Sequence, residues 1–182
     1  MGNFYLDIET TGLDPKNDKI ITIQFTELDR NTGEQVGVLK ILKLWNYSSE
    51  KELIKDFILK SDIQDPYPFS FVPIGYNLGF EHKFFYERCK VNGLEPIDIL
   101  NNPFIDLRAV GVIMNQGEFK GSGLDTITDK RQNGSMIPKL YTEEKYQEIE
   151  DYITDEAKNF IKFASWLYKE LPSLLIKYKS EM

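Results

Sequence analysis

Two carboxylates, Asp7 and Glu9, lie two residues apart near the start of the sequence. The aromatic and branched residues around them, over residues 4–8, predict a β-strand. Side chains at positions i and i+2 of a strand share a face, so both acids point the same way. Neighbouring carboxylates repel each other unless a cation lies between them, and oxygen-only ligands suit Mg²⁺ or Mn²⁺. The pair therefore predicts either a metal site or a strand end with two solvated acids.

The residues after the two acids extend the pattern. The run Asp7-Ile8-Glu9-Thr10-Thr11-Gly12-Leu13 resembles the first motif of the DEDD-type 3′–5′ exonucleases, a branch of the ribonuclease H-like fold. This resemblance implies that Asp7 and Glu9 are catalytic metal ligands. It also implies that the turn of Thr10, Thr11, Gly12 and Leu13 binds the terminal nucleotide, with Leu13 against the last base.

A second motif lies about seventy residues further on. Residues 74–85 read as a strand end, a turn and a helix that stops at Asn92-Gly93. Asn77 and Glu81 are four residues apart, and we expect them to share a face of this helix. Asn77-x-x-Phe80-Glu81 resembles the second motif of the family, with Glu81 where the family has Asp. The resemblance implies a metal ligand at Glu81 and a substrate contact at Asn77.

The third motif is Tyr152-x-x-x-Glu156, which resembles the tyrosine branch of the family, again with Glu in place of Asp. The histidine branch would require His at position 151, which is Asp. Asp155 is the competing acid. Position 156 continues the line of Phe160 and Ala164, which we expect to face the core, whereas Asp155 lies on a polar row. We therefore choose Glu156 as the metal ligand and expect Tyr152 to orient the attacking water.

Together these motifs imply a two-metal mechanism, in which one ion activates the water and the other stabilises the leaving 3′ oxygen. The implied cofactors are two Mg²⁺ or Mn²⁺ ions. The implied ligand is the 3′ end of a single-stranded nucleic acid, with a polymerase or another replication or DNA repair protein as partner. The implied ion ligands are Asp7, Glu9, Glu81 and Glu156.

Residues 115–140 are rich in Gly, Ser and Asn and contain several basic residues. Lys130 and Arg131 stand out in this otherwise acidic chain. The segment is predicted either as a solvated loop or as a loop in which these two residues contact phosphates. His82, the only histidine, is predicted as a surface or packing residue.

The order of elements must bring these motifs together. Residues 19–27 and 35–44 predict two further strands, joined by a turn at residues 31–33. Ser49 is predicted to cap a helix, residues 71–75 to form a short buried strand and residues 104–106 another. A long helical region is expected from Thr142 to just before Pro172. The result is an α/β chain whose ribonuclease H-like mixed sheet combines an antiparallel three-strand meander with parallel strands, with helices packed on it.

Length and composition set the remaining limits. The 182 residues suit one exonuclease-like domain, residues 1–182, with a hydrophobic content of 41%. A net charge of −7 argues against a protein that holds long nucleic acid by broad electrostatics, although it does not exclude a nuclease. We expect no membrane-spanning helix and no signal region. The lone Cys89 fits a reducing cytoplasm.

Three functions remain open at this point. The first is a metal-dependent 3′–5′ exonuclease. The second is a nucleic-acid-binding module on the same fold that lacks catalysis, and the third is a partner-binding scaffold. The ordered resemblance of three motifs favours the first.

Overall fold

The computed structural model describes residues 2–128 and 134–182. Five strands form one mixed sheet in the order β3-β2-β1-β4-β5. The first three strands pair antiparallel, while β4 runs parallel to β1 and β5 parallel to β4. This arrangement confirms the predicted α/β class and the meander followed by parallel strands. The strands are β1 (Gly2–Thr10), β2 (Ile20–Leu28), β3 (Gln35–Lys43), β4 (Phe71–Gly75) and β5 (Ile105–Asp106).

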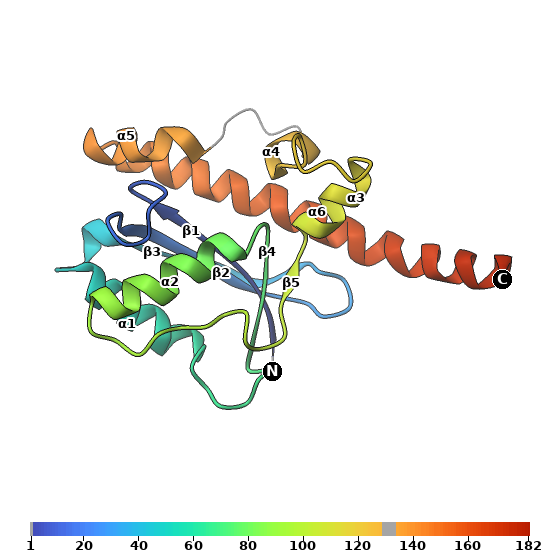
Figure 1. Ribbon diagram of the computed structural model, residues 1–182, viewed down its shortest axis with the longest axis horizontal. Helices are drawn as coiled ribbons and strands as arrows, with labels where there is room; N and C mark the ends of the chain where they lie inside the picture. The colour runs from blue at the N-terminus through green and yellow to red at the C-terminus, as the bar shows by residue number, and fades with distance from the viewer. Residues whose placement is uncertain (1, 129–133) are drawn as a thin grey trace.

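Helices cover both faces of this sheet (Figure 1). On one face α1 and α2 pack against the apolar side chains of β1, including Leu6 and Ile8. On the other face α6 packs against Tyr5 and the neighbouring strands. The helices are α1 (Glu50–Ser61), α2 (Gly79–Val91), α3 (Arg108–Met114), α4 (Leu124–Ile127), α5 (Ile137–Thr142) and α6 (Tyr146–Glu181), with 3₁₀ turns η1 (Leu44–Asn46) and η2 (Gly134–Met136).

Local signals in the sequence position several of these ends. Ser49 is the N-cap of α1, and its hydroxyl oxygen accepts a hydrogen bond from the Glu52 backbone N–H at 3.3 Å. Helix α2 ends at Val91 with Asn92 as its C-cap, and Gly93 follows with a left-handed φ of 64°, which glycine adopts more readily than other residues. Both ends agree with the predicted cap and stop signals.

Two sequence expectations about helix geometry are wrong. Asn77 lies before α2 with a left-handed φ of 73°, so it does not share a helical face with Glu81. The predicted long helix does not open at Thr142, because Thr142 ends α5 and α6 begins at Tyr146. A polar turn between them, with Glu144 at a φ of 56°, separates the two helices.

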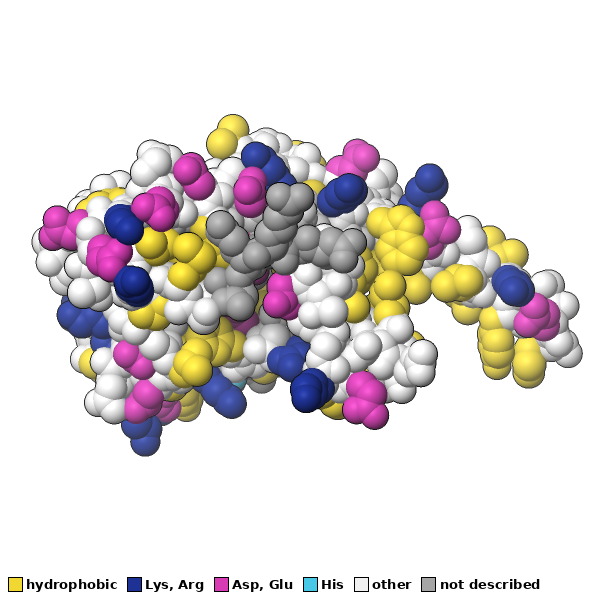
Figure 2. Space-filling view, turned by 90° about the horizontal axis from the view of Figure 1, so that it is seen from above, with side chains coloured by type: hydrophobic (Ala, Val, Ile, Leu, Met, Phe, Trp, Pro, Cys, Tyr) yellow, Lys and Arg dark blue, Asp and Glu magenta, His cyan; other side chains and the backbone are white. Residues whose placement is uncertain are grey.

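The predicted end before Pro172 is also wrong, because α6 continues through this proline to Glu181. Proline removes one backbone N–H from a helix and clashes with the carbonyl four residues earlier. Residues 171–182 are all exposed, and this end of α6 projects beyond the rest of the molecule (Figure 1), so the ring of Pro172 meets no neighbouring element. The projecting end carries exposed apolar side chains (Figure 2), namely Leu171, Leu174, Leu175, Ile176 and Tyr178.

Within the two described ranges, no helix is both long enough and apolar enough to cross a bilayer.

Candidate active site

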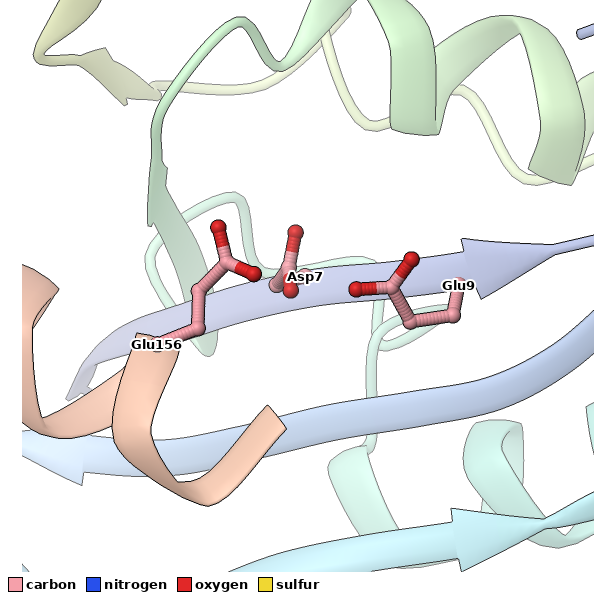
Figure 3. Close-up of side chains that lie close together, drawn as sticks. All are labelled: Asp7, Glu9 and Glu156. Carbon is pink, nitrogen blue, oxygen red and sulfur yellow. The ribbon is translucent and has the colours of Figure 1, made fainter. Parts of the chain in front are cut away.

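Three carboxylates meet where β1 faces α6. Oxygen atoms of Asp7, Glu9 and Glu156 all lie within 4.8 Å of one another. Figure 3 shows Asp7 and Glu9 on the strand and Glu156 on the helix, with their carboxyl groups turned toward one another. Residues 149 positions apart in sequence therefore contribute to one acidic cluster.

The alternation of β1 and the apolar stripe of α6 explain this meeting. Leu6 and Ile8 pack toward α1 and α2, which turns Asp7 and Glu9 toward α6. On α6 the buried Phe160 and Ala164 face the sheet, and Glu156 extends their line by one turn. Asp155 instead has 73% of its side chain exposed and lies 3.8 Å from Lys158. Of the two adjacent acids, Glu156 is the one that points inward.

Glu81 approaches the same cluster from the first turn of α2. Glu81 is not one of the three clustered carboxylates. It is only 4% exposed, and its Oε2 atom is buried with no hydrogen-bond partner. Burial raises the pKa of this carboxyl well above its usual range, and the negative charges of Asp7, Asp106 and Glu156 raise it further. A buried acid beside other acids is a costly arrangement unless a proton or a cation compensates it.

Tyr152 lies one helical turn before Glu156 and is 5% exposed. Burial raises the pKa of its phenol, and the charges of Glu156 and Glu9 together with a hydrogen bond to Glu156 raise it further. The phenol therefore stays protonated at neutral pH. A protonated hydroxyl can orient a water molecule but cannot remove its proton.

The turn after β1 borders a cavity of about 500 Å³ next to the acids. Thr10, Gly12 and Leu13 line it, and the Leu13 side chain is 84% exposed. A Cβ atom at Gly12 would overlap the Asp18 carboxylate, so any other residue here would force that side chain to move. Thr11 is not among the lining residues, since its hydroxyl donates to Asp18 and accepts from the Lys19 backbone N–H.

Asn77 lines the same cavity. Asp106 holds its backbone in place: the Asp106 carboxylate accepts hydrogen bonds from the N–H groups of Asn77 at 2.8 Å, Leu78 at 3.0 Å and Arg108 at 3.0 Å. This bonding ties the turn before α2 to the end of β5. Asp106 thus has a structural function.

Tyr76 and Arg108, which also border the site, are not in the predicted set. Tyr76 directly follows β4, and Arg108 lies two residues after the end of β5. Ligand sites of open α/β sheets gather at the carboxyl ends of parallel strands, and that position is the signal that could have found both residues. Of the predicted residues, Lys130 and Arg131 lie outside the described part of the chain. His82 is not among the residues that line the cavity, and its Nδ1 atom lies 3.4 Å from Asp98 Oδ1.

The donor set suits a hard divalent cation. The three clustered carboxylates offer only oxygen atoms, which Mg²⁺ and Mn²⁺ prefer. The buried Glu81 oxygen without a hydrogen-bond partner is a further donor beside them. Asp7, Glu9 and Glu156, with Glu81 beside them, are the residues that would hold such ions.

Comparison with known proteins now identifies the family. The model of the RNase H superfamily matches residues 4–168. The chain belongs to this superfamily. Among curated proteins, none matches it in sequence.

Solved structures of exonuclease I share the fold of this RNase H superfamily chain. The zinc-bound Escherichia coli exonuclease I–single-stranded DNA complex has a TM-score of 0.60 and 14% identity, covering 98% of this chain and 42% of that one. The structure of SSB/exonuclease I with the inhibitor CFAM has a TM-score of 0.50 and 15% identity, covering 74% and 38%. The chain thus spans less than half the length of these exonucleases. At such low identity the likeness shows the fold alone.

Proposed function

We propose that residues 1–182 form one 3′–5′ exonuclease domain that depends on Mg²⁺ or Mn²⁺. The observation that carries this proposal is the meeting of Asp7, Glu9 and Glu156 beside a cavity bordered by the turn after β1. Membership of the RNase H superfamily supports a nuclease, and the tyrosine-branch spacing of Tyr152 and Glu156 supports the exonuclease class.

The residues have separate functions in this proposal. Bound divalent ions supply Lewis-acid activation of water and stabilisation of the leaving oxygen. Asp7, Glu9, Glu81 and Glu156 hold the ions, and the protonated Tyr152 orients the attacking water. The turn of Thr10, Thr11, Gly12 and Leu13 receives the terminal nucleotide, with Leu13 packed against its base.

The proposed ligand is the 3′ end of a single strand. Exonuclease I, the structural relative, was solved with single-stranded DNA, which supports this choice. An apolar contact from the exposed Leu13 makes no hydrogen bond to a base edge, so we expect little sequence preference. A polymerase or other replication or repair partner, phosphate contacts by Lys130 and Arg131, and a cytoplasmic location remain predictions from the sequence.

Degradation of end-labelled oligonucleotides tests the activity. Single-stranded DNA and RNA that carry a 5′ label should give a ladder of shortened products with Mg²⁺ or Mn²⁺, whereas a 3′ label should be released as a mononucleotide. EDTA should stop both reactions. A 5′ label released first would contradict the direction, and cleavage that is unaffected by EDTA would contradict metal dependence.

A binding module without catalysis is the second candidate. Glu at positions 81 and 156 is longer by one bond, about 1.5 Å, than the Asp of the family motifs, and Mg²⁺ tolerates little change in geometry. Under this alternative the protein binds oligonucleotides but leaves both labels intact with either metal. Glu156→Asp then tests whether the longer side chain is the cause, because a gain of activity would implicate it.

A further inference from the structure

A second cavity, of about 290 Å³, lies on the other side of Asp7 along β1. The cavity beside the turn is bordered by Asp7, Glu9 and Thr10, whereas this one is bordered by Asp7 and Tyr5. Tyr5, Asp7 and Glu9 follow one another on one face of the strand, so the two cavities lie in sequence along it. Glu156 borders both, and the acidic cluster stands between them.

Arg108 supplies a cationic group to this second cavity. It is the first residue of α3, and the Asp106 carboxylate fixes its backbone N–H. Its Nη1 atom donates to the Asn77 side-chain oxygen at 2.7 Å, and its guanidinium lies 5.9 Å from the centre of the Phe119 ring. These contacts hold the guanidinium group in one orientation.

The hydrogen-bonding capacity of Arg108 is only partly used. Its Nε atom is buried and has no hydrogen-bond partner. Among the described residues no carboxylate lies within 4.0 Å of its guanidinium nitrogens, in contrast to Arg88, which is paired with Glu50. A buried donor on a charged group without a partner is costly, and a ligand with acceptor oxygens would compensate it.

Phosphate is the ligand chemistry that fits these donors. The planar guanidinium presents N–H groups that match phosphate oxygens in a bidentate manner. Asp125 also borders the cavity and would repel an anion, so the phosphate must lie on the Arg108 side. The terminal nucleotide occupies the turn cavity in the proposed function, and the preceding nucleotide must then leave along the strand toward Arg108.

We infer that Arg108 binds the phosphate on the 5′ side of the scissile one. This inference rests on the proposed function, because it needs the terminal nucleotide in the turn cavity. It adds a binding residue from β5 and α3, outside the three sequence motifs. It also defines the course of the strand, from the Arg108 cavity past Asp7 to the turn.

Binding of modified oligonucleotides tests this inference without any cleavage. Fluorescence anisotropy in EDTA measures the affinity for single strands that carry one neutral methylphosphonate at the last, second-last or third-last linkage. Arg108→Gln should weaken binding of the unmodified strand about tenfold, since hydrogen bonds to charged groups are strong. The second-last methylphosphonate should weaken wild-type binding similarly but should not weaken Arg108→Gln further. Arg30→Gln, a change at an exposed arginine of the β2–β3 turn, is the matched control and should bind as wild type.

The outcomes separate the two proposals. If the wild type binds no oligonucleotide in EDTA, this inference fails, whereas the proposed function is decided by the end-labelled assay with metal. Two results with a wild type that does bind would overturn only the inference. In the first, Arg108→Gln binds the unmodified strand as tightly as wild type does. In the second, the methylphosphonate at the second-last linkage still weakens binding by Arg108→Gln. Arg108→Lys is the substitute if Arg108→Gln does not fold, because it retains a positive charge without the bidentate guanidinium. A methylphosphonate at the second-last linkage should lower the affinity of Arg108→Lys less than it lowers the affinity of wild type.

Discussion

The Nη2 atom of Arg88 lies 2.6 Å from Oε2 of Glu50, and both side chains are at most 5% exposed. This buried pair also holds the chain that follows the turn after β1. Arg88 donates to the backbone carbonyls of Pro15 and Lys16, and Glu50 accepts from the backbone N–H of Ile20. Helices α1 and α2 are thus linked to the loop between β1 and β2, whose first residues border the candidate site.

We predict that Arg88→Met destabilises the protein by about 3–5 kcal/mol, because it leaves the buried Glu50 carboxylate without its cation. Urea denaturation measures the free energy of unfolding. Lys55→Met is the control, since Lys55 and Glu52 form an exposed pair at 3.2 Å and such pairs contribute only about 0–1 kcal/mol. Equal losses in the two variants would show that the buried pair contributes no more than a surface pair.

The adjacent acids Asp155 and Glu156 should behave differently when neutralised. Glu156→Gln removes a carboxylate from the cluster of three, so Mn²⁺ affinity and nuclease activity should each fall by about 100-fold or more. Asp155→Asn changes an exposed side chain and should leave both within about twofold. Calorimetric titration with Mn²⁺ and the end-labelled assay measure the two effects. The reverse ranking would overturn the choice of Glu156.

Tyr152→Phe should lower kcat while Mn²⁺ affinity stays close to that of wild type. The raised pKa keeps the phenol protonated, so its contribution is a hydrogen bond and not proton removal. The pH profile of kcat should therefore keep its shape in the variant. Disappearance of a limb of this profile on removal of the hydroxyl would instead indicate that Tyr152 is the general base.

Glu81 should make the stability of the metal-free protein depend on pH. Burial, with the charges of Asp7, Asp106 and Glu156, raises its folded-state pKa above the unfolded value of about 4.3. The folded state then binds a proton more readily than the unfolded state, so this group stabilises the fold fully below the unfolded pKa. That contribution is lost as the pH rises through the folded pKa.

In EDTA, Glu81→Gln should therefore have a higher Tm than wild type at pH 8, and the difference should shrink toward pH 5. Differential scanning fluorimetry measures it, with the exposed Glu118→Gln as control. Added Mn²⁺ should raise the Tm of wild type more than that of the variant, because a cation compensates the buried charge. A variant that is less stable than wild type at pH 8 would contradict this account.

Local patterns in the sequence determined much of the fold. Alternation over residues 4–8 predicted which side chains of β1 face each layer of helices, and Leu6 and Ile8 do pack opposite to Tyr5. The Ser49 cap and the Asn92-Gly93 stop are equally local, because they depend on hydrogen bonds within a few residues. The helical stripe on α6 distinguished Glu156 from Asp155 for the same reason.

Tertiary structure decided what local patterns could not. The left-handed backbone of Asn77 depends on bonds to Asp106, 29 residues away, and Glu81 is costly only because the folded chain buries it among other acids. The helix passes Pro172 because its end projects into solvent. The position of Arg108 after β5 could have suggested a site residue, but its approach to the acids is decided by the fold. These features depend on burial and on contacts between distant segments, and neither has a signature at fixed spacing in the sequence.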